Sequence, residues 1–208
     1  MKKFSYLLIA LLIGGFAAGC GIQKDLKTIE NLKTAFEGES NASAKYAKFA
    51  EQARAEGKTQ IAAMFSATSR AEAIHAANHK KVLKRLGVEV GKAKIKEVPT
   101  GDMTADLRDA IKGETYEANV MYPEFIKVGN EENIADARKT FTWALDTEKK
   151  HRDFYTEVLN KMAVGMDKTI PVEWYVCPVC GNTYNANTLK GSCDFCRTSR
   201  TKFEEFRS

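Results

Sequence analysis

The sequence lacks a marked excess of charge of one sign. Its 208 residues contain 32 lysines and arginines against 27 aspartates and glutamates, which gives a formal net charge of +5. Lys2 and Lys3 lie in a segment that we expect to be removed, and without them the balance is 30 basic to 27 acidic residues. Proteins that bind nucleic acid carry clustered basic residues. We therefore expect no nucleic-acid partner, and no run of charge indicates a polybasic membrane patch.

A hydrophobic run long enough to cross a membrane is also missing. The apolar stretch 4–16 follows two lysines and is shorter than the roughly 20 residues of a spanning helix. This layout is typical of a secretory signal, so we expect residues 1–19 to be a signal peptide. The end of the stretch, Ala17-Ala18-Gly19-Cys20, resembles a bacterial lipobox, which predicts that Cys20 is lipidated and becomes the mature N-terminus. An uncleaved anchor helix is the alternative. Both interpretations predict an exported, membrane-anchored protein that faces the periplasm or the cell exterior.

Apolar residues recur with helical spacing through most of the remaining chain. Four amphipathic helices are predicted, at 24–56, 59–86, from 104 past 128, and 131–162. Residues 87–103 contain Gly and Pro without a sustained period, so they predict a long connection. Pro123 predicts a kink or an early end of the third helix. Four helices with one long crossover fit a mainly α, ferritin-like four-helix bundle, which we place at residues 20–165.

The remaining segment, residues 166–208, has turn residues and no helical period. It holds four of the five cysteines, in two CxxC pairs: Cys177 with Cys180, and Cys193 with Cys196. This spacing is typical of a tetrahedral thiolate site, for which zinc and iron both fit. A segment of about 40 residues rarely buries a sufficient core unaided. We therefore expect a small β domain stapled by a metal, with disulfides as a weaker alternative in an exported protein.

Histidine is scarce, yet two of the three histidines stand in the same local pattern. His75 and His151 each follow a glutamate, Glu72 and Glu148, by three residues. Residues three apart lie on one face of a helix, so each pair can reach one metal ion. The third histidine, His79, has no counterpart in the other half of the bundle. We expect it to be a hydrogen-bonded core residue rather than a ligand.

Acidic residues occupy helix faces that should be buried. Glu39, Glu72, Glu114 and Glu148 lie on the inner stripes, and Glu117 lies on or next to one. Burying unpaired carboxylates is costly, and their mutual repulsion raises their pKa values. Two ferrous ions would supply +4 and two ferric ions +6 against the five negative charges. Glu39 precedes Glu72 by 33 residues, and Glu114 precedes Glu148 by 34. This repeated ligand set predicts a carboxylate-bridged di-iron site; two ordinary surface ion pairs are the alternative.

Two tyrosines follow the isolated glutamates at similar distances. Tyr46 comes seven residues after Glu39, and Tyr122 comes eight residues after Glu114. An aromatic residue on an inner stripe usually fills the core. Each hydroxyl would nevertheless lie about two turns from a ligand, where it could orient a carboxylate. Both interpretations remain open at this stage.

Several motifs in combination resemble the rubrerythrin family. They are FEGES, AEAIH, GETYEANVMYP, TEKKH, YVCPVCG and CDFC, and together they extend over nearly the whole chain after the leader. The resemblance implies a non-haem di-iron site in the bundle and a rubredoxin-type iron site in the tail. It implies a peroxidase that reduces hydrogen peroxide to water in defence against oxidative stress. An external electron donor protein and a head-to-tail homodimer, with one chain's tail near the other's di-iron site, are implied as well.

The resemblance also implies individual roles for residues. Glu72 and Glu148 would bridge the irons; Glu39 and His75 would hold one iron, and Glu114 and His151 the other. Glu117 would replace His75 on oxidation. Cys177, Cys180, Cys193 and Cys196 would hold the electron-transfer iron. Protons would be relayed through carboxylates or tyrosine hydroxyls, which makes Glu117, Tyr46 and Tyr122 the candidate catalytic residues.

Two features depart from the family pattern. Arg197 follows the second CxxC, where a glycine such as Gly181 normally eases the turn. The leader predicts export, so a nicotinamide cofactor would not be at hand as the electron source. An iron-binding or ferroxidase protein of the cell envelope is the main alternative function, although storage does not require an electron-relay tail. A structural or interaction module with a zinc ribbon is a third possible function.

Overall fold

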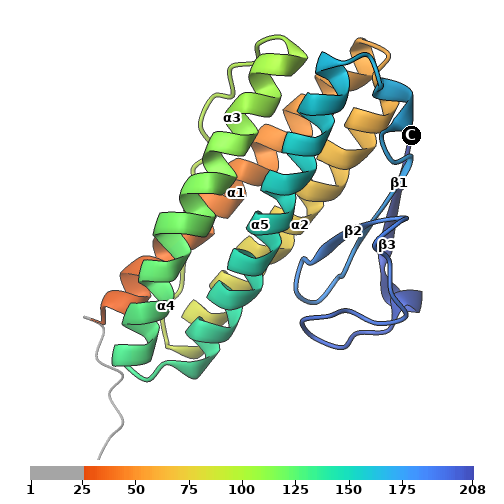
Figure 1. Cartoon of the computed structure of the whole chain (residues 1–208). Helices are drawn as coiled ribbons and strands as arrows, with labels where there is room; N and C mark the ends of the chain where they lie inside the picture. Colours follow the sequence, from red (N-terminus) through yellow and green to blue (C-terminus); the bar gives the residue numbers. More distant parts are fainter. Residues whose placement is uncertain (1–25) are drawn as a thin grey trace, which may run out of the picture.

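The computed structural model describes residues 26–208, and the predicted signal peptide and Cys20 lie outside this range. The helices of the bundle are α1 (Lys27–Ala55), α2 (Thr59–Arg85), α3 (Met103–Tyr116), the π-helix η1 (Glu117–Met121), α4 (Tyr122–Glu131) and α5 (Ala135–Ala163). The tail contains the 3₁₀ helices η2 (Asp167–Thr169) and η3 (Arg200–Lys202) and the strands β1 (Glu173–Val176), β2 (Thr183–Asn185) and β3 (Glu204–Arg207). The structure confirms a mainly α protein with a ferritin-like bundle and a small β domain (Figure 1).

The bundle consists of two pairs of helices joined by one long connection, as the sequence predicted. α1 packs against α2, and α3 and α4 pack against α5. Residues 88–102 connect the two pairs without helix or strand, in agreement with the predicted connection. Gly87 follows the C-terminal cap of α2 and turns the chain away from the helix, with a positive φ of 75° that is readily adopted only by glycine. No helix within residues 26–208 combines the length and the hydropathy needed to cross a bilayer.

The third helix is interrupted as its proline predicts, but by a wide turn rather than a break. Pro123 lies in the first turn of α4, where its missing N–H is tolerated. Immediately before it the chain forms η1, and the amide of Tyr122 donates to the carbonyl of Glu117 in a five-residue turn. The fourth helix begins at Ala135, later than the predicted start near 131. Asn133 adopts a φ of 56° there, a conformation that asparagine tolerates better than most residues, and the chain turns.

The tail domain shares its core with the bundle. Its sheet has the strand order β2-β1-β3, with both pairings antiparallel. Trp174 of β1 is buried and packs edge-on against Phe154 of α5, with ring centroids 4.9 Å apart. Strands β1 and β3 contact α2, so the tail lies along the bundle (Figure 1). This continuous apolar contact fixes the cysteine loops relative to the helices.

Candidate metal centres

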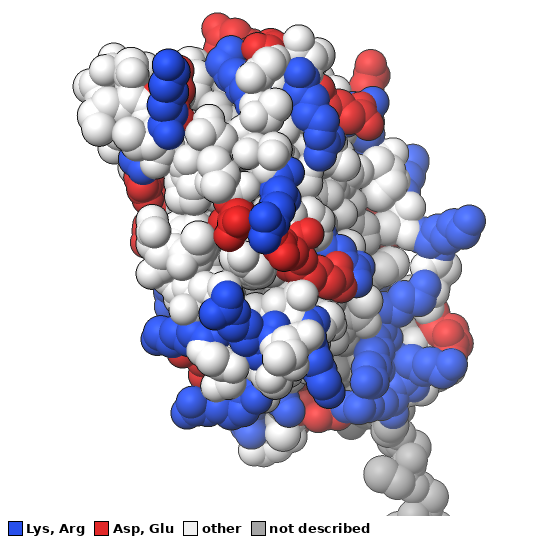
Figure 2. All heavy atoms as spheres, turned by 90° about the vertical axis from the view of Figure 1, so that its right-hand side faces the viewer, with Lys and Arg blue, Asp and Glu red and all other residues white. Residues whose placement is uncertain are grey.

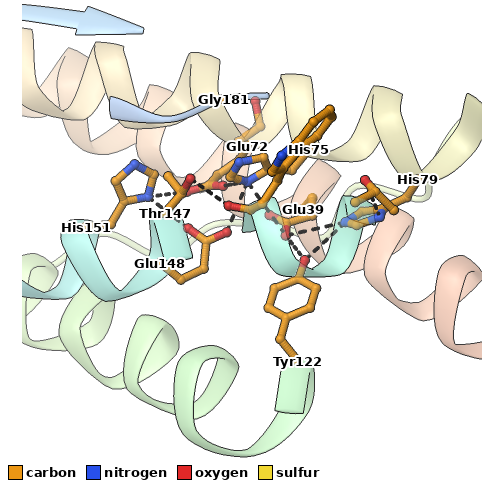
Figure 3. A network of polar contacts seen from close by, with 12 residues as sticks. Glu39, Glu72, His75, His79, Tyr122, Thr147, Glu148, His151 and Gly181 are labelled. Carbon is orange, nitrogen blue, oxygen red and sulfur yellow. Dashed lines mark hydrogen bonds and ion pairs between the residues drawn. The ribbon is translucent and has the colours of Figure 1, made fainter. Parts of the chain in front are cut away.

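Six buried side chains converge in the middle of the bundle. They come from α1, α2, α3 and α5, and each is at most 2% exposed: Glu39, Glu72, His75, Glu114, Glu148 and His151. In Figure 3, where five of the six are labelled, the side chains of Glu39, Glu72, His75, Glu148 and His151 point toward one another. All were singled out from their positions on the inner helix stripes. We call these six residues the carboxylate cluster.

The cluster divides into two groups of donors that share two members. Glu39, Glu72, His75 and Glu148 form one group, in which every ligand atom lies within 4.8 Å of the others. His75 Nδ1 lies 2.9 Å from Glu72 Oε2 and 3.0 Å from Glu148 Oε1.

The second group mirrors the first. It consists of Glu72, Glu114, Glu148 and His151. His151 Nδ1 lies 2.9 Å from Glu72 Oε1 and 3.0 Å from Glu148 Oε2. Glu72 and Glu148 therefore turn one oxygen toward each histidine, which is the arrangement that two carboxylates bridging a pair of metal ions require.

Unpaired polar atoms show that the cluster fits cations. Glu39 Oε2, Glu72 Oε1, both carboxylate oxygens of Glu148 and His151 Nδ1 are buried and make no hydrogen bond among the described residues, although several of these atoms lie only 2.9–3.0 Å from another donor of the cluster. Each such atom costs about 1–3 kcal/mol when it is left unsatisfied. Two divalent cations between the groups would satisfy these atoms and balance their charge. Oxygen and imidazole donors in this geometry are suited to iron.

The pKa shifts of the glutamates also indicate that the cluster needs cations. Burial raises the pKa values of Glu39, Glu114 and Glu148 well above the usual range, and neighbouring carboxylates raise them further. Burial also opposes ionisation of Glu72, but His151 and His75 hold its pKa below the usual range. Without cations the cluster would therefore hold most of its carboxyls neutral.

Glu117 lies beside the cluster but in neither group of donors. It sits on η1, is partly exposed, and lines a pocket of about 300 Å³ together with Lys45 and Asp109. Lys45 forms an ion pair with Asp109 at 2.9 Å. Burial, followed by the charge of Glu72, raises the pKa of Glu117 to about 8. Glu117 thus stands between the pocket and the other carboxylates, and its predicted exchange with His75 stays a prediction.

The two tyrosines hold carboxylates across the bundle. The hydroxyl of Tyr46 on α1 donates to Glu114 Oε1 at 2.5 Å, and the hydroxyl of Tyr122 on α4 donates to Glu39. Both tyrosines are buried. The sequence suggested that each hydroxyl could orient a carboxylate, but it could not indicate that each would pair with the glutamate of the other half.

His79 extends one of these contacts away from the cluster. Its Nε2 lies 3.2 Å from the hydroxyl of Tyr122, and its Nδ1 lies 3.3 Å from Thr140 Oγ1 (Figure 3). The Tyr122 hydroxyl donates its proton to Glu39, so it accepts from Nε2–H, and Nδ1 accepts from Thr140. Burial lowers the pKa of His79 to about 3, which keeps the imidazole neutral. His79 belongs to neither group of metal donors, as its lack of a counterpart in the other half suggested.

The four tail cysteines form a second site. Their sulfurs lie within 4.8 Å of one another, and all four thiols are free. The Sγ atoms of Cys177 and Cys196 are 3.4 Å apart, as are those of Cys180 and Cys193, whereas a disulfide requires about 2.05 Å. The disulfide alternative is therefore wrong, and the sulfurs are arranged to close around one iron or zinc ion.

The two CxxC loops differ in their strain. The amide of Gly181 donates to Cys177 O, and that of Arg197 donates to Cys193 O, so both loops make the same turn. The φ angles are 82° at Gly181 and 63° at Arg197. Arginine replaces the expected glycine without changing the turn, at the cost of a left-handed backbone that only glycine adopts freely.

The first cysteine loop lies directly against the carboxylate cluster. A Cβ atom at Gly181 would collide with the imidazole of His75, so only glycine lets the loop approach this closely. On the other side of the cluster, His151 Nε2 lies 2.8 Å from Thr183 Oγ1. The family resemblance implied proximity of tail and cluster only between two chains of a dimer, whereas the structure has such a contact within one chain. Gly181 and Thr183 were missed because nothing in the tail sequence indicates which helices it packs against.

Comparisons with known proteins agree with both sites. The sequence model of the family described as Rubrerythrin matches residues 30–159. Nigerythrin of Nitratidesulfovibrio vulgaris (strain Hildenborough) is 31% identical over 179 residues, which cover 86% of each protein. Rubrerythrin-2 of Clostridium acetobutylicum is 30% identical over 183 residues, covering 88% of this chain and 98% of that protein. The solved structure of nigerythrin in its fully reduced, all-ferrous state matches with a TM-score of 0.76 at 28% identity, covering 96% of this chain and 100% of that one.

Proposed function

The chain belongs to the rubrerythrin family and is a di-iron protein, and we propose that it is a non-haem peroxidase that reduces hydrogen peroxide to water in defence against oxidative stress. The reaction consumes one peroxide, two electrons and two protons and yields two water molecules. When bound, the two irons supply the two electrons and a template for the two oxygens. The residues of the chain hold this pair of ions, admit the substrate and deliver protons.

The bridging and terminal carboxylates would set the spacing of the two ions. Glu72 and Glu148 each face both histidines and would hold the ions side by side. Glu39 and Glu114 would each serve one ion, and the hydroxyls of Tyr122 and Tyr46 fix their orientation. Hydrogen bonds of this kind from outside the ligand set keep carboxylates in a productive geometry.

Substrate and protons would reach the site from the pocket at η1. Glu117 is the candidate site residue that lines this pocket, and Lys45 is the cation that faces it there. A small neutral molecule such as hydrogen peroxide can enter without a specific binding site. Glu117 is the carboxylate placed to pass protons inward from this side, with Tyr46 and Tyr122 as the hydroxyls that contact the terminal ligands.

The contact between Gly181 and His75 is the single observation that carries this proposal over iron storage. It brings the cysteine loop, one residue after Cys180, against a side chain of the carboxylate cluster. An electron passed from an iron held by the cysteines would therefore cross only a short path of bonds and contacts. A storage or ferroxidase protein would not require such a relay.

Single-turnover and steady-state measurements on anaerobically purified protein test the proposal. We expect three irons per chain and a red thiolate chromophore that dithionite bleaches and peroxide restores. Cys177→Ser should leave the oxidation of the reduced bundle by peroxide intact but stop steady-state turnover. Normal turnover in Cys177→Ser would refute the relay, and dioxygen-driven uptake of many irons per chain would favour the ferroxidase alternative.

We also propose that the protein is a membrane-anchored lipoprotein lipidated on Cys20, that it works as a homodimer, and that an external protein supplies its electrons. The leader sequence supports export, since two lysines precede an apolar stretch that ends in Ala-Ala-Gly-Cys. More than one lipid chain would be needed for stable anchoring. Mass spectrometry of the N-terminal peptide tests this, with Cys20→Ala as the control that should release the protein from membranes.

A further inference from the structure

A cleft of about 350 Å³ lies between α2, α5 and the first cysteine loop, on the outside of the bundle. Residues of all three segments line it: Lys81 and Arg85 from α2, Lys139 and Trp143 from α5, and Pro178 and Val179 from the loop. We call this the α2–α5 cleft. It is separate from the pocket at Glu117 and plays no part in holding the iron pair.

The inner wall of the cleft is also the wall of the cysteine site. Val179 stands between Cys177 and Cys180 in the sequence and is 44% exposed, so it presents an apolar side chain to the solvent next to two of the four cysteines. The indole of Trp143 packs against the cysteine cluster from the helix side. A group seated in the cleft would therefore contact the residues that enclose the sulfurs, and electron transfer depends on such short distances.

The rim of the cleft is positively charged. Arg85 is neutralised by Asp136 at 2.7 Å, but Lys81 and Lys139 form no ion pair with any residue in the range 26–208. Lys139 instead lies over the ring of Trp143, 4.8 Å from its centroid. Figure 2 shows lysines and arginines predominating in the lower part of the face that includes the tail domain. An apolar centre with a charged rim is typical of protein interfaces that form and separate quickly.

We infer that the α2–α5 cleft is the docking site for the acidic face of a one-electron donor protein, which reduces the iron in the cysteine site. The inference rests on the proposed function, because a relay needs a place where electrons arrive. The donor is oxidised by one electron at each encounter, and the cysteine-bound ferric ion becomes ferrous. The opposite charges would steer the donor to Val179, and the apolar contact would bring its redox group close.

Charge reversal tests the site in the full-length, iron-loaded protein. The probe is a small acidic flavoprotein in its hydroquinone form, and stopped-flow spectroscopy follows bleaching of the thiolate chromophore. We expect Lys81→Glu/Lys139→Glu to lower the second-order rate constant at low salt by about tenfold or more, because steering of this kind is worth 10- to 1,000-fold. Salt should slow the wild-type protein and leave the double variant nearly unchanged.

Matched variants separate this outcome from general effects of charge. Lys127→Glu changes an exposed lysine on α4, and Arg197→Glu changes the exposed residue at the second cysteine loop. Both should react at rates within about twofold of the wild type. Dithionite should bleach all variants equally, which shows that the cysteine site is intact. Equal reaction of Lys81→Glu/Lys139→Glu and wild type, or a loss confined to Arg197→Glu, would overturn the inference, as would a redox-silent cysteine site. Because bleaching is measured without peroxide, a failure of the peroxidase proposal would be seen separately.

Discussion

The hydroxyl of Tyr46 donates a hydrogen bond to Glu114 across the bundle, and Tyr122 donates the corresponding bond to Glu39 in the opposite direction. Each half of the bundle therefore holds the isolated glutamate of the other half. The two halves cannot be separated without exposing unsatisfied carboxylates at the centre. This crossed pairing ties the orientation of the metal ligands to the packing of all four helices.

Removing either hydroxyl should disturb the iron site more than the fold. Tyr46→Phe and Tyr122→Phe each leave a buried carboxylate oxygen without its donor, at a cost of about 1–3 kcal/mol. We expect weaker iron retention and a reaction with peroxide slowed by about tenfold or more, measured by metal analysis and single-turnover kinetics. Tyr155→Phe is the control, since the Tyr155 hydroxyl is buried with no partner among the described residues. A loss as large in Tyr155→Phe would show that general packing is responsible.

Gly181→Ala should uncouple the tail from the bundle. Its Cβ would collide with the His75 ring, and alanine is strained at a φ of 82°. We expect the cysteine loop to move away, so that electrons pass from the cysteine site to the iron pair much more slowly while each site still binds metal. Rapid mixing of the reduced protein with peroxide measures this step. Gly191→Ala is the control, because a Cβ there meets nothing within 4 Å. Unchanged transfer in Gly181→Ala would contradict the path through His75.

Removing the metal should make the stability of the protein depend on pH with a defined sign. The pKa of Glu117 is raised from 4.5 to about 8, and those of Glu39, Glu114 and Glu148 are raised as well. An acid with a higher pKa in the folded state binds more protons when folded. Such an acid contributes its full stabilisation at pH values below its pKa in the unfolded chain. That stabilisation is lost as the pH rises through its pKa in the folded protein. The neutral His79 has the opposite effect up to pH 6.5, the pKa of an unfolded histidine, because its pKa in the folded state is lowered to about 3. The free energy of unfolding of the metal-free protein should therefore fall most clearly between pH 6.5 and 8, by up to about 1.4 kcal/mol per pH unit for each carboxyl with a raised pKa.

Urea titrations of chelator-treated and iron-loaded protein at several pH values test this expectation. The iron-loaded protein should lack the decline, because the cations balance the ionised carboxylates. Glu117→Gln should make the metal-free curve shallower, whereas Glu124→Gln, at an exposed position on α4, should not. A metal-free protein whose stability rises over this range would show that the carboxyls ionise freely in the folded state.

Arg197→Gly should stabilise the tail. Arginine at a φ of 63° carries a penalty of about 1–2 kcal/mol that glycine avoids, although glycine loses part of this gain through the entropy of the unfolded chain. We expect a modest rise in the thermal midpoint of the cysteine-site chromophore. Arg200→Gly, at the exposed start of η3, should give no rise. Destabilisation by Arg197→Gly would indicate that the arginine side chain contributes contacts that outweigh the strain.

The carboxylate cluster was predictable because burial conflicts with charge. Glu39 and Glu148 occupy positions where helical periodicity requires apolar residues, and only cations resolve that conflict. The cysteine site was predictable because spacing alone defines a CxxC pair. Both features, a glutamate at an inner helix position and the CxxC spacing, can be recognised within a short stretch of sequence, and neither depends on how distant segments pack.

The packing of the tail was not predictable, because it depends on contacts between distant segments. Gly181 meets His75 only after β1 has packed on α2, and the α2–α5 cleft combines Lys81, Lys139 and Val179 from three separate regions. No basic run marks that cleft in the sequence. The start of α5 was misplaced for a related reason: the positive φ of Asn133 is a turn conformation that periodicity does not reveal.

The π-helix η1 explains a one-residue difference in spacing between the two halves of the bundle. Glu39 and Tyr46 are seven residues apart, but Glu114 and Tyr122 are eight; the spacings to the next helix are likewise 33 and 34. Since seven residues make almost two α-helical turns, the second half of the bundle holds one residue more than the first, and η1 accommodates it. The two halves of the bundle thus carry the same pattern of ligands, with one more residue in the second half. Deleting Asn119 should restore the symmetry of the two halves and close the wide turn that sets Glu117 apart from the other carboxylates.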